Sequence, residues 1–146
     1  MAFSDMTGHL IRRLHQHAAH VFQTRIKEAG LDLTPVQFAA MDAVATTPGI
    51  DQASIAAQIA YDRATIGGVI DRLEQKGWIT REISARDRRA REVTLTPAGQ
   101  DILDRAIPVV IALQAEILPG LSADETSHLR DLIEKSTRMI DENKDT

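Results

Sequence analysis

Residues 51–95 carry a spacing of capping residues and apolar positions that permits few folds. Asp51 and Asp62 each precede a run of apolar side chains at helical spacing, so each is predicted to be the N-cap of a helix. The two helices are expected at residues 52–59 and 63–76, and a glycine follows the second one as its stop signal. The segment therefore predicts two helices joined by a short turn.

Two short strands, joined by a charged loop, are predicted to follow. Residues 78–83 have the composition of a strand, and residues 91–95 alternate polar and apolar side chains as a half-buried strand does. Residues 84–90 between them are polar and charged. Helix, short turn, helix and hairpin, in that order, make a winged helix-turn-helix, whose second helix can enter the major groove of DNA.

Helices are predicted on both sides of this segment. Apolar residues recur at helical spacing on two faces of residues 6–28. Capping boxes at residues 34–37 and 122–125 open two further helices, the second of which extends to about residue 140. A Thr-Pro pair opens another helix over residues 98–117. With aromatic residues at only 3% the core must be aliphatic, which favours helix. We expect one mainly α domain with a small β-hairpin wing, an α/β winged helix.

The net charge of −4 points away from nucleic acid, but its distribution does not. Residues 100–146 hold the acidic excess, with five Lys and Arg against ten Asp and Glu. The hairpin gathers five arginines, which are Arg81, Arg86, Arg88, Arg89 and Arg91. Arginines at a hairpin tip can reach phosphates or a minor groove. We expect Asp87 to pair with Arg89 and hold the loop in shape. The alternative is a solvated hairpin with exposed charge.

Gly67 and Gly68 interrupt the second helix of the pair. Two glycines cost a helix about 1–2 kcal/mol relative to alanine, so they call for a compensating role. One explanation is a close approach of the helix backbone to DNA. The other is tight packing against the preceding helix. The sequence supports both equally.

The composition also narrows the class of function. The chain has no cysteine, no apolar run long enough for a membrane helix and no signal-peptide pattern, so we expect a cytoplasmic protein with no membrane contact. The histidine spacing predicts no metal site, and no cofactor is expected. An enzyme is disfavoured because the chain lacks a Gly-rich phosphate loop and a nucleophile setting. A winged-helix module for protein interaction is a further alternative, but it would not need arginines at its tip.

Three motifs together resemble the multiple antibiotic resistance regulator (MarR) family. Leu33-Thr34-Pro35-Val36-Gln37-Phe38 is similar to the family's L-T-x-x-Q-(F/W/Y) entry to its second helix. Residues 62–77 resemble its recognition helix. Asp87-Arg88-Arg89-Ala90, followed by residues 93–99, resembles its D-x-R wing and L-T-x-x-G sequence. Residues 12–16 and 49–52 are similar to a subgroup often encoded beside genes of aromatic-compound catabolism.

This resemblance implies a homodimer. Residues 1–30 and 98–146 would form its helical dimerisation region, and residues 31–97 its winged helix-turn-helix DNA-binding lobe. It also implies a transcriptional repressor that leaves a pseudo-palindromic double-stranded DNA operator when a small aromatic carboxylate or phenol binds. By position, the residues expected to contact DNA are Gln52, Ser54, Arg63, Thr65, Arg72, Arg86, Arg88 and Arg89.

A site for the aromatic effector is predicted near the first helix. His9 and Arg13 are four residues apart and share a helix face. His15 lies on an apolar stripe, an unusual place for an imidazole unless it faces a polar cavity. Phe38 and Tyr61 can supply aromatic walls, so these five residues are the predicted effector contacts. The alternative is that the cationic side chains form surface ion pairs and the histidines are solvated.

Overall fold

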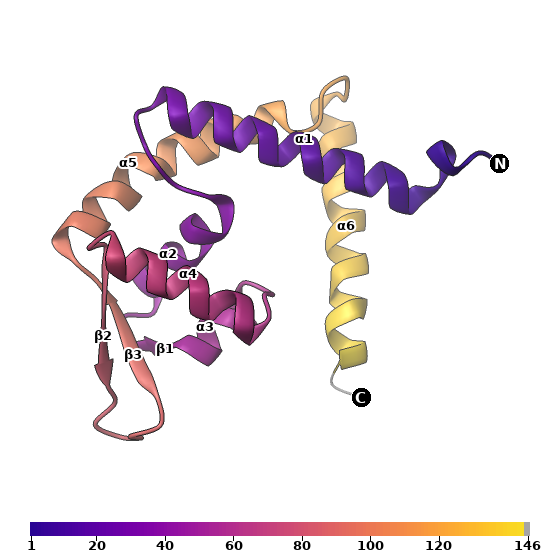
Figure 1. The fold of residues 1–146 in the computed structure, drawn as a ribbon. Helices are drawn as coiled ribbons and strands as arrows, with labels where there is room; N and C mark the ends of the chain where they lie inside the picture. The colour runs from indigo at the N-terminus through magenta and orange to yellow at the C-terminus, as the bar shows by residue number, and fades with distance from the viewer. Residues whose placement is uncertain (145–146) are drawn as a thin grey trace.

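The computed structural model describes residues 1–144 and folds them mainly into helices around a small sheet (Figure 1). The elements are a 3₁₀ turn Phe3–Asp5, α1 Thr7–Glu28, α2 Pro35–Thr46, β1 Ile50–Asp51, α3 Gln52–Gln58, α4 Arg63–Gln75, β2 Ile79–Ile83, β3 Arg91–Leu95, α5 Pro97–Leu113, a 3₁₀ turn Gln114–Glu116 and α6 Ala123–Lys144. The predicted fold class is confirmed. The last helix continues past residue 140, and residues 145–146 of the predicted dimerisation region lie outside the described residues.

The capping residues identified in the sequence begin their helices as predicted. Asp51 accepts a hydrogen bond from the backbone N–H of Ser54 at 2.8 Å. The box that opens α2 is complete, because Thr34 and Gln37 each bind the other's backbone N–H. The box before α6 is complete in the same way. Local capping therefore sets the starts of these helices.

The sheet has one strand more than the sequence predicts. Its order is β1-β3-β2, and both pairings are antiparallel. In the extra strand, β1, Ile50 pairs with Val93 and Asp51 with Glu92. Two residues are too few to show the alternation from which strands are recognised in a sequence. This strand joins the start of α3 to the hairpin of β2 and β3, which is the wing.

The buried core is aliphatic, as the composition indicates, and lies between the sheet, α2 to α5 and the C-terminal end of α1. Its large and fully buried side chains are Ile26, Met41, Val44, Ile55, Ile66, Ile70, Leu73, Ile79, Val93, Leu103 and Leu113. α4 contributes three of these side chains, so one of its faces is fixed against the lobe and the opposite face is exposed to solvent.

α6 and the first half of α1 project from this lobe (Figure 1). α6 buries none of its residues, and its apolar side chains Leu132, Ile133, Met139 and Ile140 are each about half exposed. Exposed apolar side chains on α1 include Leu10 and Ile11. Within residues 1–144, no helix combines the length and the apolar character needed to cross a membrane.

Candidate nucleic-acid interface

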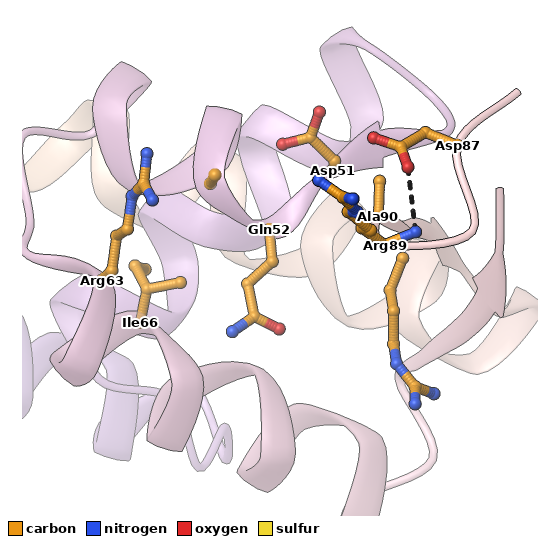
Figure 2. A pocket seen from close by; sticks show the side chains of 9 residues that line it. Asp51, Gln52, Arg63, Ile66, Asp87, Arg89 and Ala90 are labelled. Carbon is orange, nitrogen blue, oxygen red and sulfur yellow. Dashed lines mark hydrogen bonds between the residues drawn. The ribbon is translucent and has the colours of Figure 1, made fainter.

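A cavity of about 410 Å³ lies between the start of α3, the start of α4 and the wing. Three of the predicted DNA-binding residues, Gln52, Arg63 and Arg89, line it together (Figure 2). In that view Gln52 lies between the two arginines. The other lining residues are Asp51, Ala53, Ile66, Asp87, Ala90 and Arg91. The fold thus brings onto one surface cationic and amide side chains from three separate elements.

The wing loop is shaped by hydrogen bonds within itself. The buried hydroxyl of Ser84 accepts from the backbone N–H groups of Arg86 and Asp87, at 3.1 and 3.3 Å. The carboxylate of Asp87 accepts from the backbone N–H of Arg89 at 2.9 Å (Figure 2). These bonds hold the backbone of the loop, and the side chains of Arg86, Arg88 and Arg89 are exposed on it. This is the geometry that phosphate contacts require.

This loop corrects one expectation and reveals one missed residue. Asp87 and Arg89 do interact, but through the backbone N–H of Arg89 and not through its guanidinium. A carboxylate two residues before an N–H closes a turn more readily than it reaches a long side chain. Ser84 was missed, although a serine followed by a polar turn is a known signal for a side chain that caps a loop.

Arg81 has a different role from the other arginines of the hairpin. Its Nη2 lies 2.8 Å from a carboxylate oxygen of Asp71 and 3.0 Å from one of Glu74, both on α4. The hydrogen bond from Arg81 lowers the pKa of Glu74 and raises that of Arg81. Arg81 therefore ties β2 to α4 and offsets the two acidic residues of that helix.

At the start of α4, Thr65 is bound to the residue that caps the helix. Asp62 accepts from the backbone N–H of Thr65 at 2.7 Å and from its hydroxyl at 2.9 Å. The backbone N–H of Thr65 holds the pKa of Asp62 below its usual range. The hydroxyl of Thr65 still has acceptor capacity for DNA, and Arg72 is exposed further along the helix. At α3, Ser54 likewise donates its N–H to Asp51, so phosphate contacts there depend on the side chains of Gln52 and Ser54.

The two glycines of α4 are not required by packing. A Cβ added to Gly68 meets nothing within 4 Å, and one added to Gly67 meets only Nε2 of Gln52, at an ordinary 3.6 Å. The explanation by tight packing against α3 is therefore wrong for Gly68. The remaining explanation, a close approach of DNA to the helix backbone, stays a prediction.

Comparison with known proteins agrees with this geometry. Residues 33–90 match the model of the MarR family. The chain is 34% identical over 135 residues to the transcriptional regulator HosA of Escherichia coli O127:H6, covering 92% of this chain and 97% of the relative. The chain belongs to the MarR family. It is therefore a MarR-family transcriptional regulator.

Solved structures show the same likeness to this MarR-family chain. BpsR of Bordetella bronchiseptica, whose DNA binding is regulated by 6-hydroxynicotinic acid, matches with a TM-score of 0.86 and 29% identity. That match covers 94% of this chain and 96% of BpsR. A mutant of MarR from E. coli complexed with operator DNA matches with a TM-score of 0.83 and 26% identity, over 93% and 98% of the two chains.

The predicted effector residues of the MarR-family chain are spread over several elements. Nδ1 of His9 lies 3.5 Å from Nη2 of Arg12, and the His9 ring contacts the ring of Phe3. Arg13 and His15 are exposed on the half of α1 that projects from the lobe (Figure 1). Phe38 packs edge-on against Phe22, with ring centroids 6.3 Å apart, and Tyr61 is exposed in the turn between α3 and α4. The site they were expected to form stays a prediction.

Two further side chains of α1 bind the 3₁₀ turn that follows α5 in this regulator. Arg25 donates to both carboxylate oxygens of Glu116 and holds the pKa of that carboxyl below its usual range. A ring nitrogen of His17 lies 3.0 Å from the backbone carbonyl of Glu116. These residues and His20 line a second cavity, of about 430 Å³. The sequence alone gave no sign of this connection, which joins residues far apart in the chain.

Proposed function

We propose that the chain is a sequence-specific DNA-binding repressor that works as a homodimer on a pseudo-palindromic operator and leaves it when a small aromatic carboxylate or phenol binds. The observation that carries this proposal is the surface on which Gln52, Arg63 and Arg89 meet. It combines the exposed face of α4, suited to the major groove, with arginines on an internally braced wing, suited to phosphates or the minor groove.

Apolar surface that one chain leaves uncovered supports the proposed dimer. α6 has no buried residue, and the first half of α1 exposes further large apolar side chains. Burying such surface against a second copy is favourable by about 25 cal/mol per Å². In this proposal the dimerisation region consists of residues 1–30 and 98–146, and the DNA-binding lobe consists of residues 31–97. A two-fold axis then places the two α4 helices in major grooves about 34–36 Å apart.

The effector is proposed from the relatives and from the residues on α1. BpsR responds to 6-hydroxynicotinic acid, a small aromatic carboxylate. Such a ligand needs a cationic or donor group for its carboxylate and an apolar slot for its ring. In this proposal the cationic and donor groups come from His9, Arg13 and His15. The walls of the apolar slot come from Phe38 and Tyr61. Because these residues lie on separate elements, we assign the pocket to the dimer, in which α1 of a second copy can complete it.

Fluorescence polarisation with the DNA upstream of the gene tests this function. We expect the wild-type dimer to bind a fragment of that DNA, and Arg88→Ala to bind it at least tenfold more weakly. Arg105→Ala, checked by gel filtration to have the same oligomeric state as the wild type, is the matched control, because Arg105 is an exposed arginine on α5 and is not among the predicted DNA contacts. Wild-type protein that binds no upstream fragment at low salt contradicts the proposal, as does an equal loss in both variants.

The effector is tested separately by thermal unfolding with a panel of aromatic acids and phenols. A ligand present at 100 times its Kd stabilises the folded dimer by about 2.7 kcal/mol. We expect at least one compound to raise the melting temperature and to release bound DNA. A panel in which no compound does either contradicts the effector part of the proposal and leaves the DNA-binding part standing.

A further inference from the structure

The side chain of Lys76, at the C-terminal end of α4, crosses to the first turn of α2. Its ammonium donates to the backbone carbonyl of Asp32 at 2.8 Å and to the side-chain oxygen of Gln37 at 3.3 Å. It also lies 3.4 Å from the carboxylate of Asp32. Only 16% of the Lys76 side chain is exposed, which is unusual for a lysine and indicates a structural role.

The same ammonium sits over the ring of Trp78, 4.6 Å from the ring centroid. A cation in this position is attracted to the face of the indole. The end of α4, the turn before α2 and the start of β2 therefore meet at a single positive charge.

Gln37 connects the Lys76 ammonium to the first turn of α2 and, through the next residue, to α1. Its side-chain oxygen also accepts from the backbone N–H of Thr34, so it closes the capping box of α2 while it binds Lys76. Gln37 is itself buried, with 7% of its surface exposed. The next residue, Phe38, packs against Phe22 of α1. A continuous set of contacts thus runs from α1 through the first turn of α2 to the end of α4.

We propose that Lys76 is a positioning residue for DNA binding. It fixes the end of α4 against the first turn of α2, and so sets the orientation in which the exposed face of α4 meets DNA, without contacting DNA itself. This inference rests on the proposed function, in which α4 is the DNA-reading helix. Losing the contact lowers the fraction of molecules in the binding-competent orientation, and the apparent affinity falls by the same factor.

A positioning role and a phosphate contact predict different salt dependence. A side chain that contacts phosphate contributes about one unit to the slope of log affinity against log salt, so its removal from both subunits lowers the slope by about two. A positioning residue lowers the affinity and leaves the slope unchanged. The slope therefore separates the two roles of a lysine.

The experiment compares Lys76→Met, which keeps an apolar stem over Trp78, with Lys76→Arg, which keeps the charge and the donors. Lys27→Met, checked by gel filtration to have the same oligomeric state as the wild type, is the matched control, because it removes the same charge from an exposed position on α1. Trp78 is the only tryptophan of the chain, so its fluorescence reports the contact in the protein without DNA. Operator affinity is measured over a series of salt concentrations, on variants shown by thermal unfolding to be folded.

We expect Lys76→Met to change the Trp78 emission and to lower operator affinity about tenfold with an unchanged salt slope. Lys76→Arg should keep the Trp78 emission and the operator affinity close to those of the wild type. Lys27→Met should resemble the wild type in both measurements. If Lys76→Met is not folded, Lys76→Gln, which keeps a neutral donor, should show a smaller loss of the same kind. Unchanged affinity, or a slope reduced by about two, overturns the positioning role while wild-type binding stands. A wild type that binds no DNA instead overturns the proposed function on which this role rests.

Discussion

Gly99 lies directly against the backbone of Trp78. A Cβ added to Gly99 would stand 2.8 Å from the carbonyl carbon of Trp78, and closer still to its oxygen. Thr96 holds the two segments together, because its N–H donates to the carbonyl of Trp78 at 3.0 Å and its hydroxyl to that of Gly77 at 2.6 Å. The first turn of α5 is thus attached to the turn that follows α4, and the L-T-x-x-G sequence has a physical explanation.

Substitution of Gly99 should therefore be severe. Backbone cannot move aside as a flexible side chain can, so we expect Gly99→Ala to lower the free energy of unfolding by about 3 kcal/mol. Gly8→Ala is the matched control, because a Cβ on Gly8, in α1, meets nothing within 4 Å. Chemical denaturation measures both. A Gly99→Ala protein as stable as the wild type contradicts the close packing described above.

Gly68→Ala should separate stability from DNA binding. With open space around the new Cβ, alanine should stabilise α4 by about 1 kcal/mol through its higher helix propensity. The same methyl group should weaken operator binding if DNA approaches the backbone at this position. Thermal unfolding and fluorescence polarisation measure the two effects. A more stable variant with unchanged affinity leaves Gly68 without a role at the DNA.

The sheet contains a pair of like charges whose removal should stabilise the protein. Glu82 of β2 lies directly opposite Glu92 of β3. Like charges in this arrangement are destabilising, and threonine has a higher strand propensity than glutamate. We expect Glu82→Thr to raise the free energy of unfolding by about 0.5 kcal/mol at low salt. The part of the gain that comes from charge should shrink at 1 M salt, and a gain that grows with salt would contradict this explanation.

Asp62 should contribute to acid sensitivity. The N–H of Thr65 stabilises the ionised form, so the pKa of Asp62 is lower in the folded chain than in the unfolded chain. The resulting stabilisation is present above the unfolded value of about 3.9 and is lost as the pH falls through the lower folded value. Asp62→Asn keeps a capping side chain but does not titrate. We expect its melting temperature to fall less than that of the wild type between pH 5 and pH 3. An equal fall in both contradicts this role.

Features that depend on neighbours in the sequence were predicted well, and features that depend on distant residues were not. Asp51 and Asp62 cap their helices because the N–H groups they bind are only three residues away. The partners of Arg81 and Lys76 lie on other elements, and nothing local distinguishes these two side chains from solvated ones. Sequence alone could place Arg81 in a basic cluster but could not show that α4 neutralises it.

Some residues of the candidate site could be predicted from one local segment, and others are brought together only by the fold. The wing arginines follow from one short segment, and the structure places their side chains where the loop was expected to expose them. Gln52, Arg63 and Arg89 come from three elements, and only the fold shows that they share a surface. The need for glycine at position 99 could not be predicted either, because a sequence does not show which backbone segment lies in contact with a glycine.

Salt dependence of operator binding tests the central claim, that α4 and the wing bind DNA, most directly. If the dimer makes about 6–10 phosphate contacts, its affinity should fall by about 10³–10⁵ between about 50 and 200 mM salt. The double variant Arg86→Ala with Arg88→Ala should reduce the slope of log affinity against log salt by about four, because each subunit loses two contacts. A binding reaction insensitive to salt, or a double variant with the wild-type slope, would contradict the account.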